Sequence, residues 1–121
     1  MASELQPLTP AELDIMQVVW DHPAVTVQEV VAQLADGRAY TTVLTLLRIL
    51  EQKGHVGATR EGRRHLYTAT HPRHAHERAL VHGVVRDVFA GDAARLVRHL
   101  VEADALGPAE RAELRRLLGE G

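Results

Sequence analysis

The sequence contains no cysteine and few aromatic residues, and both absences narrow the classes of protein to which it can belong. Without cysteine, disulfide frameworks and thiolate metal sites are excluded, and the composition fits a reducing cytoplasm. Aromatic residues make up only 3% of the chain, so the core must be aliphatic, and we expect the single tryptophan, Trp20, to lie in it. A hydrophobic content of 45% supports a packed core, and 121 residues suggest one domain or a small domain with an extension.

Long hydrophobic runs are also missing. No apolar run approaches the roughly 20 residues that a membrane-spanning helix needs. Residues 1–4 lack the basic start and the apolar stretch of a signal peptide. These absences predict a cytoplasmic protein without a membrane partner.

Basic residues are absent from positions 1–37, which carry six acidic side chains. Residues 38–65 then hold six basic and two acidic side chains, a local excess of +4. The six are Arg38, Arg48, Lys53, Arg60, Arg63 and Arg64. The net charge of −2 argues weakly against a nucleic-acid partner, but the local field decides where a polyanion docks. The distribution therefore favours nucleic-acid binding by residues 38–65.

Residues 40–53 predict a helix with one apolar and one polar side. The helical period assigns to the buried side Val43, Leu46, Leu47 and Leu50. The opposite side carries Thr41, Thr45, Arg48 and Gln52, with Leu44 and Ile49 on its flanks. Short hydroxyls, an Arg and a Gln are side chains that contact base edges and phosphates in a major groove. The alternative is an ordinary solvent-exposed helix face.

Two capping boxes mark the starts of two earlier helices. In each, a threonine is followed three residues later by a glutamate, as Thr9 by Glu12 and Thr26 by Glu29. Pro10 at the first helical position strengthens the first of these signals.

The second of these helices, over residues 26–35, is followed by a turn at 36–38 and by the helix at 40–53, which together form a helix-turn-helix pattern. The same spacing is common in modules that bind proteins. A winged-helix module for protein binding, without sequence-specific DNA binding, is therefore the alternative function.

A hairpin with a basic tip follows this pattern. Residues 56–60 and 65–69 predict two strands, joined by a turn at 61–64 that contains two arginines. A helix backed by a core and followed by such a hairpin is the layout of a winged helix-turn-helix. The predicted fold is mostly α, with an N-terminal winged helix of three helices and a β-hairpin wing over residues 1–70.

The rest of the chain, residues 71–121, predicts three amphipathic helices, over about 73–89, from 93 and from 108. Their apolar faces cannot all be buried against one small domain, so we expect a homodimer held by these C-terminal dimerisation helices. The residues expected in the dimer interface are Val85, Val88, Leu96, Val97, Leu100, Leu114 and Leu117.

The predicted DNA-binding residues lie on the polar helix face, at the wing and at one helix start. They are Thr26, Thr41, Thr42, Leu44, Thr45, Arg48, Arg60, Arg63 and Arg64. Leu44 is expected to pack on a thymine methyl, and Arg48 to contact a guanine edge or a phosphate. The wing arginines are expected to hold the DNA backbone. Thr26 is either a phosphate contact at a helix N-terminus or a plain N-cap.

Catalytic motifs are absent, since no Ser/His/Asp set, no His-Glu-x-x-His and no phosphate-binding glycine loop is present. The chain is predicted not to be an enzyme and to need no cofactor. His71, His74 and His76 are weak candidates for a zinc, copper or nickel site. Such a site would be easiest if Pro72 left this stretch extended, and the alternative is a polar connector.

Three segments carry a distinctive pattern, namely residues 8–16 with Trp20, residues 39–50 with Lys53-Gly54, and residues 64–69. They resemble the penicillinase-repressor family of bacterial winged-helix repressors. The resemblance covers nearly the whole chain, and Tyr-Thr-Thr-Val at 40–43 and Lys-Gly at 53–54 are specific parts of it. It implies a transcriptional repressor that binds an inverted-repeat operator as a homodimer and silences by occupying it, with a sensor protease as a further partner.

The chain departs from this family's pattern in three places. The Asn-Phe bond that is cut to release some family members is replaced by Gly91-Asp92-Ala93, and the cysteine cluster of the copper-responsive branch is missing. The histidines at 71, 74, 76 and 82 are not part of the pattern. The inducing signal and the way of release therefore stay open.

Overall fold

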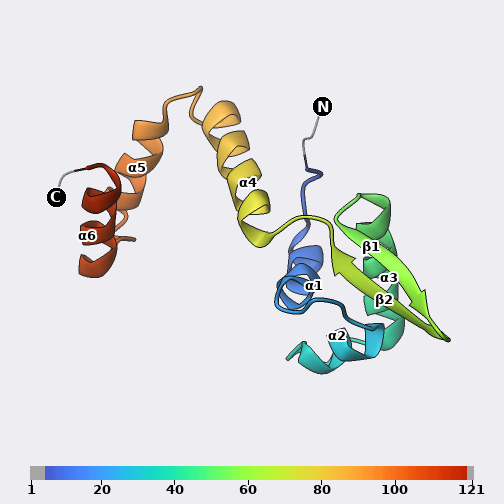
Figure 1. The fold of residues 1–121 in the computed structure, drawn as a ribbon. Helices are drawn as coiled ribbons and strands as arrows, with labels where there is room; N and C mark the ends of the chain where they lie inside the picture. Colours follow the sequence, from blue (N-terminus) through green and yellow to red (C-terminus); the bar gives the residue numbers. More distant parts are fainter. Residues whose placement is uncertain (1–4, 120–121) are drawn as a thin grey trace. The chain divides into compact units, whose positions relative to one another are not determined.

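The computed structural model describes residues 5–119, and this part of the chain forms six helices and one hairpin. Figure 1 shows how they follow one another along the chain. Residues 1–4, at which no signal peptide was predicted, lie outside it. The elements are α1 (Pro10–Trp20), α2 (Val27–Gln33), α3 (Tyr40–Gln52), β1 (Val56–Glu61), β2 (Arg64–Ala69), α4 (Arg73–Asp87), α5 (Ala93–Glu102) and α6 (Pro108–Leu117). The predicted mostly α fold with a winged helix-turn-helix is confirmed.

The contacts divide the chain into two compact units, Met1–Leu80 and Val81–Gly121, so the division falls within α4. The sequence places its domain boundary earlier, after residue 70. The first part of α4 belongs to the N-terminal unit because its side chains pack there. Arg73 bonds to Gln17 of α1 and to Asp21 directly after it, and the His76 ring is buried beside Trp20.

The core of the N-terminal unit is aliphatic, as the composition predicts. α1, α2, α3 and the hairpin each contribute to it, through Ile15, Met16, Val19, Val25, Val27, Val30, Val43, Leu47, Leu50, Val56 and Tyr67. Each such side chain stabilises the fold by about 1.5–3 kcal/mol when it is fully buried. The predicted buried side of α3 is correct except for Leu46, which is half-buried.

Trp20 lies at the rim of this core and is half-buried, which corrects the expectation of a core position. Its indole N–H donates a hydrogen bond of 3.0 Å to the carbonyl of His71. A tryptophan whose ring packs on apolar groups while its N–H needs an acceptor is well placed at such an edge.

β1 and β2 form an antiparallel hairpin in which Val56 pairs with Ala69 and Glu61 with Arg64. Both strands are longer than predicted, so the turn consists only of Gly62 and Arg63. Gly62 has a φ of +64°, a backbone conformation that a tight turn requires and that glycine adopts readily. A bridge between Val25 and Tyr67, which the sequence analysis did not predict, extends this sheet toward the start of α2.

The helices also end earlier than predicted. α2 ends at Gln33 rather than near residue 35, and α4 ends at Asp87 rather than near residue 89. After α4, Ala90 and Gly91 have positive φ values of 52° and 88°, which stop the helix.

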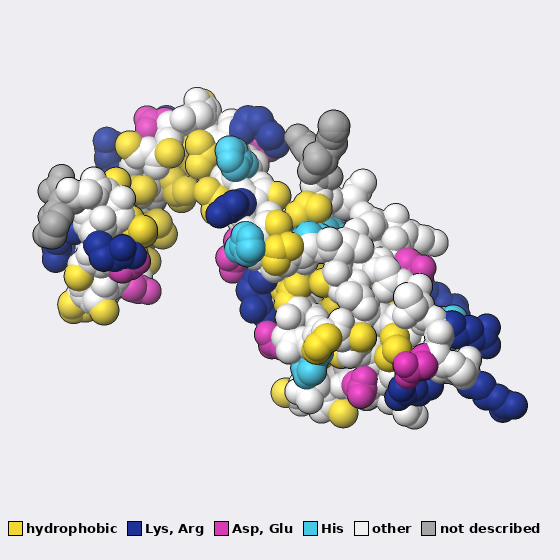
Figure 2. Space-filling model, viewed as in Figure 1, with side chains coloured by type: hydrophobic (Ala, Val, Ile, Leu, Met, Phe, Trp, Pro, Cys, Tyr) yellow, Lys and Arg dark blue, Asp and Glu magenta, His cyan; other side chains and the backbone are white. Residues whose placement is uncertain are grey.

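The C-terminal unit leaves its apolar side chains largely exposed. No described residue of α5 or α6 is buried, and Leu117 is 67% exposed. Figure 2 shows hydrophobic side chains gathered along these helices, and Lys and Arg side chains gathered at the hairpin of the other unit. No helix among residues 5–119 is long and apolar enough to cross a membrane.

Candidate nucleic-acid interface

The polar face of α3 is open to solvent, as its pattern predicts. Thr41, Thr42, Thr45 and Arg48 are exposed, and Leu44 is half-buried on the flank. The Thr45 hydroxyl donates a bond of 2.9 Å to the carbonyl of Thr41. Thr45 therefore offers a partner its methyl group and its oxygen lone pairs, but not its proton. Arg48 has no hydrogen bond or ion pair within the part of the chain that the structure describes, so its guanidinium is free.

The wing carries three exposed arginines, and they differ in how freely they can meet a ligand. Arg63 stands at the tip of the hairpin without a partner among the described residues. Arg60 donates from Nε to the carbonyl of Gly62 at 3.3 Å. Arg64 is paired with Glu61 at 2.6 Å, but both side chains are well exposed, so this pair is weak and readily exchanged.

A hollow of about 850 Å³ lies between α2, α3 and the hairpin. Six of the nine predicted DNA-binding residues line it, namely Thr26, Leu44, Arg48, Arg60, Arg63 and Arg64. Thr41, Thr42 and Thr45 are not part of its lining. The structure thus brings the flank of α3 and the wing together on one concave surface, with the three threonines beside it.

Seven further residues with polar side chains, none of them among the predicted DNA-binding residues, line the same hollow: Gln28, Glu29, Tyr40, Glu51, Thr59, His65 and Tyr67. Tyr40 precedes Leu44 by four residues, so the helical period was a signal for it. His65 pairs with Arg60 in the hairpin register, and that register became known only with the structure.

The positive charge of this region is smaller than the sequence count suggests, since ion pairs with distant residues neutralise two of the six basic side chains. Lys53 is 2.7 Å from the buried carboxylate of Glu12 and also donates to the carbonyl of Pro7. Arg38 is paired with Asp14 and Asp36. The described cations without an ion pair in this stretch are Arg48, Arg60 and Arg63.

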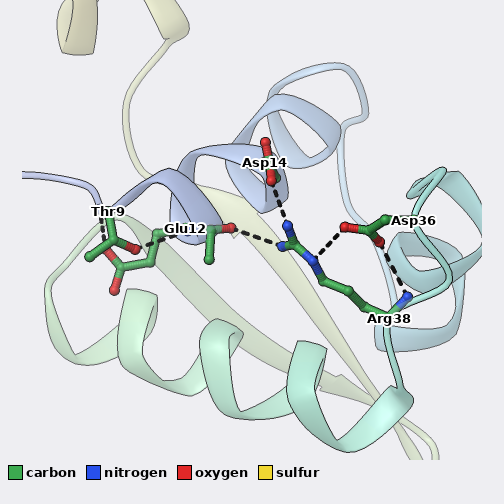
Figure 3. Close-up of polar contacts among 6 residues, drawn as sticks. Thr9, Glu12, Asp14, Asp36 and Arg38 are labelled. Atoms are coloured by element: carbon green, nitrogen blue, oxygen red, sulfur yellow. Dashed lines mark hydrogen bonds and ion pairs between the residues drawn. The ribbon is translucent and has the colours of Figure 1, made fainter.

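Two polar networks fasten α3 to α1, one at each end of α3. At its C-terminal end, burial raises the pKa of Glu12, but hydrogen bonds from Lys53 and the Thr9 backbone and the charge of Lys53 outweigh this, so the pKa is lowered. At its N-terminal end, Figure 3 shows the guanidinium of Arg38 between Asp14 of α1 and Asp36 of the turn. The polar face of α3 is therefore held in place by charged contacts as well as by the core.

Thr26 acts as the N-cap of α2, which is the second of the two roles left open above. Its hydroxyl oxygen accepts from the backbone N–H of Glu29 at 3.1 Å, and its own N–H donates to the Glu29 carboxylate at 2.8 Å. The Thr26 backbone N–H lowers the pKa of Glu29, which keeps a negative charge at this helix end. A phosphate contact by Thr26 would have to use its hydroxyl proton and overcome this carboxylate.

His71, His74 and His76 do not come together as the candidate metal site requires. α4 begins at Arg73, so His74 and His76 lie on different sides of a regular helix and not in the extended stretch that would make a metal site easiest. His74 is exposed, whereas the rings of His71 and His76 lie beside Trp20 and also beside the ring of His55. Within residues 5–119, no three His, Asp or Glu side chains are placed so as to hold a metal ion.

The residues predicted for the dimer interface lie on apolar faces that their own unit does not cover. Val88, Val97, Leu100 and Leu117 are 37–67% exposed. The remaining three, Val85, Leu96 and Leu114, are half-buried. The structure contains one chain, so their role in a dimer stays a prediction.

Comparison with known proteins places these features in a family. A family model described as penicillinase repressor matches residues 8–120. The penicillinase repressor of Bacillus licheniformis is 28% identical over 115 residues, which cover 93% of this chain and 90% of that protein.

Two solved structures resemble the chain in its N-terminal part. The DNA-binding domain of the repressor BlaI is 31% identical, with a TM-score of 0.52, and the match covers 60% of this chain and 90% of that one. The monomeric form of Bacillus licheniformis BlaI in complex with the blaP half-operator is 30% identical, with a TM-score of 0.50. This match covers 57% of this chain and 87% of that one.

Proposed function

The chain belongs to the penicillinase repressor family, and from this premise we propose that it silences transcription by occupying an inverted-repeat operator as a homodimer. It is a DNA-binding transcriptional repressor and not an enzyme. The observation that carries the operator proposal is the concave surface of α2, α3 and the wing, on which Arg48, Arg60 and Arg63 have no acidic partner among the described residues. The similar protein BlaI of Bacillus licheniformis forms a complex with the blaP half-operator, which supports operator binding by this chain.

In this proposal the N-terminal part of α3 enters the major groove. Thr41, Thr42 and Thr45 contact base edges or phosphates, with Thr45 restricted to accepting bonds or making methyl contacts. Leu44 packs on a thymine methyl, and Arg48 contacts a guanine edge or a phosphate. Arg60, Arg63 and Arg64 lie along the DNA backbone, where they supply affinity that falls as salt rises.

The dimer belongs to the proposal because the C-terminal unit exposes apolar side chains that water does not stabilise. Leu100 and Val101 of α5 are about two-fifths exposed, and Leu117 of α6 and Leu118 directly after it are more exposed than that. A second copy would cover these faces. The dimer would then present two copies of α3, the proposed recognition helix, to two half-sites that lie one or more helical turns apart.

A sensor protease would have to act on the link between α4 and α5 if release followed the family's proteolytic route. This link is exposed at Ala90 and Gly91 but carries Gly91-Asp92-Ala93 instead of an Asn-Phe bond. The proposal therefore assigns silencing to operator occupancy. The protease and the cytoplasmic location stay predictions from the resemblance and the composition.

A gel shift with the promoter of the protein's own gene, repeated over a range of salt concentrations, tests the proposal. We expect a specific shift that weakens steeply as salt increases, and a much weaker shift with a scrambled duplex. Equal affinity for both duplexes would contradict operator binding. No shift with either would favour the protein-binding alternative.

A further inference from the structure

We propose that Arg38 is a positioning residue for operator recognition. Its guanidinium holds the first turn of α3 against α1, and this placement sets how much more tightly the protein binds its operator than random DNA. The inference rests on the proposed operator binding. It assigns to a basic residue of the DNA-binding region a role that involves no contact with DNA.

Arg38 occupies the link between α2 and α3, directly before the residue at which α3 begins. The N-cap of α3 is Ala39, whose side chain makes no capping bond, and the first turn of α3 contains no acidic residue. α1 and α2, by contrast, both start with a complete capping box. The start of the recognition helix is therefore fixed by its surroundings rather than by its own cap.

The contacts of Arg38 supply this fixation. Nη2 lies 2.6 Å from the Asp14 carboxylate and Nε lies 2.7 Å from the Asp36 carboxylate, as Figure 3 shows. Nη1 donates to the carbonyl of Ala11 at 3.4 Å, and the backbone N–H of Arg38 donates to Asp36 at 3.2 Å. All three guanidinium nitrogens are engaged, which a planar, rigid fork achieves and an ammonium group cannot.

The surroundings of Arg38 also argue against a phosphate contact. Its side chain is 23% exposed, whereas that of Arg64 at the wing is 60% exposed. The two carboxylates and one guanidinium together carry a net charge of −1, which repels a phosphate. Hydrogen bonding to Asp14 further raises the pKa of Arg38, so the guanidinium stays charged and paired.

The value of the contacts is geometric, because exposed ion pairs add little to stability. The core holds α3 through Val43, Leu47 and Leu50, whereas the three residues of α3 that precede Val43 are exposed. Thr41 and Thr42, which are proposed to meet bases, lie in the first turn, close to Arg38. Base contacts depend on placement to within about 0.5 Å, whereas contacts to phosphates tolerate a shift. Loosening Arg38 should therefore reduce specificity more than total affinity.

The test uses Asp14→Asn, Arg38→Lys and Arg38→Ala in the full chain. Each variant is titrated at several salt concentrations with the duplex that the wild type selects from a randomised pool and with a scrambled duplex of equal length. Asp14→Asn separates the two roles by sign, since it removes one negative charge. A charge effect alone would tighten binding to both duplexes, whereas loss of positioning weakens binding to the selected duplex.

We expect Asp14→Asn and Arg38→Lys to weaken binding to the selected duplex about three- to tenfold, and Arg38→Ala about tenfold, the size of one lost base contact. Binding to the scrambled duplex should change less than about threefold, and the salt slope should stay the same. A lost phosphate contact would instead reduce that slope by about one.

Asp21→Asn is the matched control, because Asp21 follows the last turn of α1 and forms a comparable exposed pair with Arg73 at 2.9 Å. It should leave the ratio of the two affinities unchanged. Thermal midpoints, measured in parallel, show whether each variant is folded at the assay temperature.

Two results would overturn the inference. One is tighter binding of both duplexes by Asp14→Asn together with a reduced salt slope in Arg38→Ala, which would make Arg38 a phosphate contact. The other is an unchanged affinity ratio in all three variants. If the wild type selects no duplex from the pool, the proposed operator binding fails, and that outcome is distinguishable from both.

Discussion

The two units of this protein treat their apolar side chains in opposite ways. In the N-terminal unit, eleven apolar residues from three helices, the hairpin and a bridging segment form one buried cluster. In the C-terminal unit, α5 and α6 bury none of their described residues, although their apolar residues repeat at helical spacing. An amphipathic pattern alone therefore does not distinguish a helix of the core from a helix of an interface. The two cases differ in whether the same chain supplies a second apolar surface against which the helix can pack.

The largest effect is expected from a cavity in the N-terminal core. Leu47→Ala removes a completely buried side chain from the core-facing side of α3, so the free energy of unfolding should fall by about 2–5 kcal/mol. Urea unfolding followed by circular dichroism measures the change. Leu117→Ala, at a 67% exposed site, is the control and should cost much less at concentrations where the chain is monomeric.

The contrast between the two units predicts that the C-terminal unit needs a partner to cover its apolar faces. Leu100 lies on the apolar face of α5 and is 39% exposed in a single chain. Leu100→Asp places a charge on this face and should convert the dimer to monomer at low micromolar concentration. Sedimentation velocity measures this. Arg98→Asp introduces the same side chain at an exposed polar position of α5 and should leave the dimer intact. A dimeric Leu100→Asp variant would place the interface elsewhere.

A smaller effect is expected on DNA binding, which we propose for the N-terminal unit. Arg48→Ala should weaken operator binding by about 1–3 kcal/mol if Arg48 contacts a guanine, because a bidentate base contact has this size. Arg63→Ala should weaken operator and random DNA alike and lower the salt slope by about one. Fluorescence anisotropy over a salt series separates the two. Unchanged affinity in both variants would contradict the proposed DNA-binding surface.

The smallest effect concerns pH and is again confined to the N-terminal unit. Burial, with His55 nearby, lowers the pKa of His71 and His76 below 6.5. The folded chain keeps these rings neutral while the unfolded chain takes up protons. Their contribution to stability is therefore complete above pH 6.5 and is lost as the pH falls below it.

A double variant, His71→Gln with His76→Gln, should flatten this dependence when urea unfolding is measured between about pH 7.5 and 5.5. The exposed His74→Gln serves as the control and should keep the wild-type slope. An equal slope in all three proteins would show that these two buried rings do not govern the acid sensitivity.

The element order and the polar face of the recognition helix were predictable because their signals are local. Capping boxes at Thr9 and Thr26, a three-and-four repeat through α3 and a basic turn at the hairpin tip each act within a few residues. The bridge from Val25 to Tyr67 was not predictable, since it joins two segments that only the folded chain brings together. The half-buried position of Trp20 follows from its bond to His71, far along the sequence.

The candidate DNA-binding site was likewise predictable where its signals are local and not where it depends on contacts between distant segments. The helix residues that are candidates for reading DNA follow from the sequence, because the side of a helix on which a threonine or arginine lies follows from its period. Which of the nearby charges are free of an ion pair depends on the folded chain. Lys53 and Arg38 count as positive in the sequence but are neutralised by Glu12, Asp14 and Asp36 in the fold. The pairs with Glu12 and Asp14 join residues far apart in the sequence, so no local pattern reveals them.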